Sequence, residues 1–144
     1  IILFLLLPCA AVMAQEQPKG ERIRTIKIGF ISERLHLSPE QAAKFWPVYN
    51  RCQDELKEVR RDFKQKYKAS NPGSDAQMAR EFVMDNIEYK QAELNLQKKY
   101  KDELLKIISA QQLATLYQAE RDFKTMLLKQ LKEGKPVKAQ PTSR

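Results

Sequence analysis

The longest regular pattern in the chain is an apolar row between residues 39 and 69. Its members recur in steps of four and three: Phe45, Tyr49, Cys52, Leu56, Val59, Phe63 and Tyr67. This spacing puts the side chains on one face of an α-helix that packs lengthwise against a partner. The opposite face is charged. We therefore predict a long helix over 39–69 with a kink at Pro47, where the proline removes one backbone hydrogen bond.

Three further segments carry helical periodicity. In 21–36, the shared face is Ile23, Ile26 and Phe30. In 75–108, the apolar stripe is broader and less regular: Phe82, Val83, Ile87, Leu94, Tyr100, Leu104, Ile107 and Ile108. In 110–133, the apolar side is Leu113, Leu116, Tyr117, Phe123, Leu127 and Leu131. Because these periods are helical, the sequence predicts an all-α protein with four helices.

The connection between the two long helices is short. Residues 70–74, Ser-Asn-Pro-Gly-Ser, cannot continue a helix. A loop of this length makes its flanking helices antiparallel neighbours. We expect a hairpin too slender to bury much by itself, with the helices over 21–36 and 110–133 added at its ends. Residues 15–20 and 134–144 are polar and are expected to be a disordered leader and tail.

Two copies of an apolar-Ser-x-x-Gln motif mark helix starts. The copies are Leu37, Ser38 and Gln41, and Ile108, Ser109 and Gln112. In each, the Ser hydroxyl accepts from the third helical N–H and the Gln side chain reaches back to the cap N–H. Pro39 suits the first helical position. A third box, Ser74-Asp75-Ala76-Gln77, lacks the leading aliphatic residue and predicts Ser74 as a cap.

The first fourteen residues are uncharged and mostly aliphatic. Val12 and Ala14 stand at −3 and −1 of a possible cleavage site, so we expect 1–14 to be a signal peptide. The chain begins at Ile1 rather than Met, and we expect the charged n-region to precede it. A membrane anchor needs about 20 apolar residues. Residues 15–17 end the run sooner, so we expect a periplasmic protein.

Chemistry that needs histidine or paired thiols is poorly represented. His36 is the single histidine, which argues against a zinc site or catalytic triad, and we read it as a helix-end residue. After cleavage Cys52 is the single thiol, either a buried small hydrophobe or an intermolecular disulfide. No Gly-rich phosphate loop is present. We predict neither an enzyme nor a bound cofactor or metal.

The charge balance is basic, with 26 Lys and Arg against 18 Asp and Glu, a net charge of +8. Such a surface attracts acidic partners over a long range. One stretch of the 39–69 helix concentrates this charge: Lys57, Arg60, Arg61, Lys64 and Lys68. We predict that it contacts acidic or unfolded polypeptides. A merely solvated face is the alternative, and the seam aromatic residues are expected to be core or dimer contacts.

The paired motif, together with Phe45-Trp46-Pro47-Val48-Tyr49, resembles the Spy/CpxP group of periplasmic proteins in its Bacteroidetes-type branch, over roughly residues 21–133. This chain has Ser for Thr in both copies and Ile for Leu in the second. The resemblance implies a cradle-shaped homodimer of helical hairpins. It implies either an ATP-independent chaperone for unfolded or partly folded clients, or a stress sensor that works with a membrane-bound or sigma-factor-pathway regulator.

Two other functions are less favoured. Metal-binding relatives carry His-rich or clustered ligands, whereas His36 stands alone here. Nucleic-acid binding is prompted only by the charge, and the expected export signal argues against it. No small-molecule substrate is expected.

Overall fold

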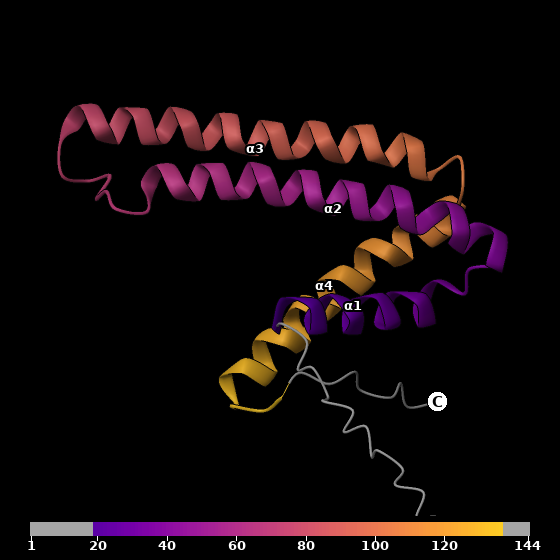
Figure 1. Cartoon of the computed structure of the whole chain (residues 1–144). Coiled ribbons are helices and arrows are strands. Elements are labelled where there is room, and N and C mark those ends of the chain that lie inside the picture. Colours follow the sequence, from indigo (N-terminus) through magenta and orange to yellow (C-terminus); the bar gives the residue numbers. More distant parts are fainter. Residues whose placement is uncertain (1–18, 137–144) are drawn as a thin grey trace, which may run out of the picture.

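The computed structural model describes residues 19–136, and this part of the chain contains four helices. They are α1 (Lys19–Leu35), α2 (Pro39–Tyr67), α3 (Ala76–Leu104) and α4 (Ala110–Lys132). The antiparallel helices α2 and α3 form a long hairpin, and α1 packs with α4 beneath one end of it (Figure 1). The predicted all-α fold with a central hairpin is confirmed. The expected signal peptide over 1–14 and most of the tail lie outside the described residues.

Several helix ends differ from the sequence prediction. Lys19 and Gly20 belong to α1 rather than to the expected leader, and α2 ends at Tyr67 rather than at 69. The third helix ends at Leu104, not 108. The N–H groups of Ile107 and Ile108 both donate to the Leu104 carbonyl, at 2.8 and 2.9 Å, in a turn that replaces the last helical residues. That turn directs the chain into the extended backbone of the next cap.

The core is concentrated where all four helices meet. Its largest cluster takes buried residues from every element: Phe30, Ile31, Leu35, Phe45, Tyr49, Leu104, Ile108, Leu113, Leu116, Ala119 and Phe123. A smaller cluster of Cys52, Leu56 and Tyr100 lies next to it in the hairpin. Between residues 57 and 99, no residue is buried. The distal half of the hairpin is therefore a rod with little interior.

Aromatic side chains take the place of a core in that distal half. Phe63 stacks on Tyr89 with ring centroids 4.7 Å apart, and Tyr67 meets Phe82 edge-on at 4.9 Å. These half-buried rings pack between α2 and α3, so the seam aromatic residues of 39–69 contact their own chain. Offset and edge-on ring pairs stabilise such thin contacts beyond their buried area.

Ion pairs across the hairpin define its register. Arg51 contacts Glu103 at 2.8 Å and Arg60 contacts Glu93 at 2.5 Å. Farther from the core, Lys66 pairs with Asp85, which also accepts from the Tyr67 hydroxyl. Partners on α3 move back along the chain as partners on α2 move forward, as antiparallel packing requires. α2 also continues through Pro47 without interruption of the helix.

None of the helices in the described range has the length and apolar character needed to cross a membrane.

Candidate functional site

Both Ser-x-x-Gln motifs form the predicted capping boxes. Ser38 Oγ accepts from the Gln41 N–H at 3.2 Å, and Gln41 Oε1 accepts from the Ser38 N–H at 3.2 Å. The second copy has the same pair of bonds between Ser109 and Gln112, at 3.1 and 3.0 Å. Each box satisfies backbone donors that the first helical turn leaves without partners.

The two boxes also bind one another, which the sequence analysis did not foresee. Gln41 Nε2 donates to Gln112 Oε1 at 3.2 Å and to the Ile107 carbonyl at 3.3 Å. In return, Gln112 Nε2 donates to the Leu35 carbonyl at 3.2 Å. The starts of α2 and α4 are thus joined through two amides. Leu37 and Ile108, the leading aliphatic residues, pack in the adjacent core. The two copies of the motif therefore have a structural role, since they hold the starts of α2 and α4 together.

The third predicted cap is wrong by one residue. Asp75, not Ser74, caps α3, since its carboxylate accepts from the N–H groups of Gln77 and Met78 at 2.8 and 3.0 Å. A carboxylate at this position also interacts favourably with the positive end of the helix.

Two helix ends use left-handed backbone. His36 follows α1 with φ 46°, which agrees with its prediction as a helix-end residue. Gly134 has φ 63° after α4, and the next N–H, that of Lys135, donates to the Gln130 carbonyl at 3.0 Å. This is the glycine stop expected for the fourth helix.

Cys52 is buried between α2 and α3, as its position in the seam predicted. Burial raises the pKa of its thiol to about 11, and the nearby carboxylates of Glu120 and Glu55 act in the same direction. The thiol is therefore protonated at neutral pH, and a protonated buried thiol is a poor nucleophile.

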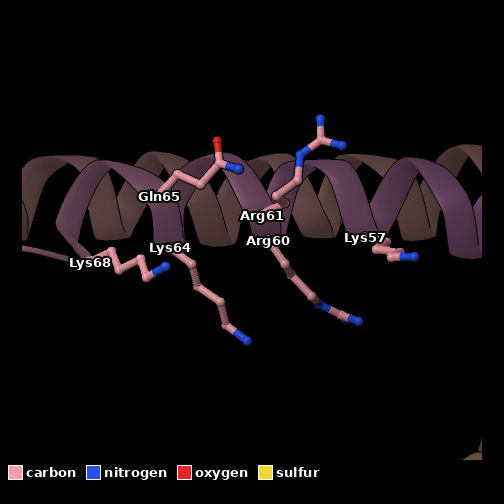
Figure 2. A pocket seen from close by; sticks show the side chains of 6 residues that line it. All are labelled: Lys57, Arg60, Arg61, Lys64, Gln65 and Lys68. Atoms are coloured by element: carbon pink, nitrogen blue, oxygen red, sulfur yellow. The ribbon is translucent and has the colours of Figure 1, made fainter. Parts of the chain in front are cut away.

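The five predicted contact residues lie together on the distal part of α2. Lys57, Arg60, Arg61, Lys64 and Lys68, with Gln65, line one open hollow on the helix surface. Figure 2 shows Arg60 and Lys64 extending from one edge of this hollow and Arg61 and Gln65 from the other. The positive charge therefore gathers on one outward face, which we call the basic face.

Most of the charge on the basic face is not neutralised by the protein itself. Arg60 is paired with Glu93 of α3, and Arg61 is paired with its neighbour Asp62, at 3.3 Å. Within residues 19–136, no ion pair engages Lys57, Lys64 or Lys68. Long side chains that carry unpaired charge on an exposed helix are free to meet an anionic partner.

The predicted apolar stripe on α3 is only partly interior. Tyr100, Leu104 and Ile108 are buried, but Val83, Ile87 and Leu94 are 56%, 62% and 43% exposed. These three residues are exposed because they lie on the side of α3 that turns away from α2, whereas Phe82 faces Phe63 of α2. α4 repeats the pattern, since Tyr117 and Leu131 are exposed although the sequence placed them on its apolar side.

A polar cluster joins three helices near the base of the hairpin. Glu120 of α4 accepts from the Tyr49 hydroxyl at 2.8 Å and from Gln53 Nε2 at 3.2 Å, both on α2. Lys27 of α1 approaches the same carboxylate at 3.4 Å. Burial, followed by the charge of Glu120, raises the pKa of Tyr49 far above its usual range. Sequence spacing within one helix cannot reveal such a cluster, because its members come from three elements.

Metal-binding geometry is also absent from the described part: no group of three or more His, Cys, Asp or Glu side chains is placed to hold an ion. No family model, curated protein or solved structure matches the chain.

Proposed function

We propose that this protein is a periplasmic binding module with ATP-independent, chaperone-like activity. Its clients would be unfolded or partly folded polypeptides with acidic segments, held on the basic face of α2, and it would act as a homodimer. The observation that carries the proposal is the gathering of Lys57, Lys64 and Lys68 on one exposed face with no acidic partner in the described range. Long-range attraction speeds encounter, and apolar contacts then hold the client.

Two further features support this reading. The distal hairpin has no buried residue, so its surface is available to a partner without disturbing the core. Large apolar side chains of α3, which packs against α2 in the hairpin, also remain exposed, among them Val83 and Ile87. Exposed apolar groups near unpaired cations suit polypeptides that combine acidic and apolar residues.

The proposal is tested by following light scattering of an aggregating acidic client at low ionic strength. We expect substoichiometric protein to suppress the scattering, and added salt to weaken the effect because it screens exposed charges. The combined variant Lys57→Gln, Lys64→Gln, Lys68→Gln is expected to lose most of the suppression.

A matched control distinguishes the effect of the basic face from the effect of the protein's net charge. Lys44, Lys98 and Lys106 are exposed lysines outside the basic face with no ion pair in the described structure. Their triple replacement by Gln removes the same charge and should leave suppression close to that of the unmodified protein. Equal loss in both variants would mean that the effect is nonspecific. If the unmodified protein does not suppress the scattering, the chaperone-like proposal is wrong. The alternative from the sequence, a stress sensor that works with a membrane-bound or sigma-factor-pathway regulator, then remains.

A further inference from the structure

Two rows of exposed side chains run along the distal half of the hairpin. The basic row on α2 has the spacing i, i+4, i+7, i+11: Lys57, Arg61, Lys64 and Lys68. The apolar row on α3 has the spacing i, i+4, i+11: Val83, Ile87 and Leu94. In a helix, each of these spacings gives one narrow stripe about 16 Å long. No acidic residue interrupts either row, and Lys90 occupies the i+7 place of the row on α3.

The two rows lie on the same broad face of the hairpin. Phe63 of α2 and Phe82 of α3 contact each other, with ring centroids 5.8 Å apart, and so mark the sides that face inward. Seen from the N-terminus of its own helix, each row lies about 100–160° clockwise from that inward side. Because the helices are antiparallel, equal rotations bring both rows to one face.

The register sets the rows opposite one another. The Arg60–Glu93 and Lys66–Asp85 pairs fix which residues share a level along the hairpin. By this register Lys64 lies near the level of Ile87, and Lys68 near Val83, to within about one helical turn. The face thus presents positive charge along α2 and, apart from Lys90, apolar surface along α3.

The base of this face is already covered by a helix of the same chain. Gln53 lies one turn before Lys57 on the same stripe of α2, and its Nε2 donates to Glu120 of α4 at 3.2 Å. From there α4 diverges from the hairpin (Figure 1). A flat membrane surface would meet α1 and α4 before it reached the rows, whereas one narrow rod can lie along them. A single helix has that width.

We propose that the two rows bind an acidic amphipathic α-helix of roughly three turns, lying along the hairpin. Its carboxylates face the basic row and its apolar side chains face the apolar row. This inference rests on the proposed function, because it names the class of client segment that the basic face takes. Recognition then depends on how acidic and apolar residues are arranged, and not on net charge alone.

The test uses three fluorescently labelled synthetic peptides and reads binding by anisotropy. The first places Glu and Leu on adjacent sides of a helix, the second has the same composition in scrambled order, and the third has Lys in place of Glu. We expect the first to bind at least about fivefold more tightly than the second, and the third not to bind. Equal affinity for the first two peptides would overturn the inference, as would binding to phosphatidylglycerol vesicles without binding to the peptide.

Matched variants test whether the peptide binds at the two rows. Lys64→Glu in the basic row and Ile87→Ser in the apolar row should each lower the affinity for the amphipathic peptide by about fivefold. Lys44→Glu on α2 and Met84→Ser on α3 replace exposed residues of the same types outside the two rows, and each should change the affinity for this peptide less than twofold. An equal effect of row and control variants would contradict the proposed placement.

Failure of this inference can be told from failure of the proposed function. If the protein suppresses client aggregation but does not distinguish amphipathic from scrambled peptides, the client specificity is wrong and the chaperone-like function stands. If it suppresses no client but binds the amphipathic peptide selectively, the rows are a docking site and the chaperone-like function is wrong.

Discussion

The amides of Gln41 and Gln112 have more partners than a capping role requires. Each completes its own box, donates to a carbonyl of the segment before the other box, and contacts the other amide. Removing one of these amides would leave its part-buried hydrogen-bond partners unsatisfied, which is costly in free energy. These two residues therefore connect the starts of α2 and α4 as well as capping them.

Single substitutions Gln41→Ala and Gln112→Ala are each expected to lower the free energy of unfolding by about 1–2 kcal/mol. Because the residues contact each other, the double variant should lose less than the sum, by about 0.5 kcal/mol or more. Urea denaturation followed by circular dichroism measures all three. Ser38→Ala and Ser109→Ala, which remove only the caps, should each cost about 1 kcal/mol. Strictly additive losses for the glutamines would show that they do not interact.

At the scale of the elements, ion pairs and hydrogen bonds connect the two helices of the hairpin along its length. Lys66, followed by the Tyr67 hydroxyl, lowers the pKa of Asp85. Nearer the core, the Tyr100 hydroxyl and then Lys99 lower the pKa of Glu55. Both carboxylates are partly open to solvent, so each contact stabilises the hairpin only modestly.

The depressed pKa values of Asp85 and Glu55 determine the direction of a pH dependence. Their stabilisation is present above the unfolded-state pKa values, about 4, and is lost as the pH falls below them toward the folded-state values. We expect amide hydrogen exchange in the distal parts of α2 and α3 to gain speed, relative to the base helices, as the pH falls from 5 to 3, after correction for intrinsic rates. Asp85→Asn should remove part of this acceleration at the hairpin tip. A uniform change over all helices would contradict the assignment.

The whole molecule combines a four-helix base with a projecting hairpin that has little interior (Figure 1). We expect it to form a homodimer, as the resemblance of its paired motifs to the Spy/CpxP group implies. Cys52 is buried within the chain with its pKa raised, so a disulfide is not expected to hold that dimer.

Light scattering after size-exclusion chromatography, with and without reductant, tests the assembly. The mass should be that of a dimer in both conditions, and Cys52→Ala should leave it unchanged. A monomer mass in both conditions would remove the homodimer proposal. A dimer found only without reductant would show that Cys52 is accessible after all.

Much of the architecture follows from local sequence. Ser38 and Ser109 cap helices because their hydroxyls meet backbone donors a few residues away, and Pro72 and Gly73 end a helix wherever they stand. The grouping of Lys57, Lys64 and Lys68 on one face is likewise set by helical spacing alone. Such features depend on residues within one or two turns of each other, so the sequence by itself determined them.

Only the tertiary structure decided which parts of each stripe are interior. Tyr100 and Ile87 belong to the same broad apolar pattern of α3, yet Tyr100 is buried against Cys52 and Leu56 of α2, whereas Ile87 is exposed on the side of α3 that turns away from α2. The joining of Gln41 to Gln112 and of Glu120 to α2 also depends on how the helices meet. Burial and long-range hydrogen bonds are properties of the packed chain, and periodicity along one helix does not contain them.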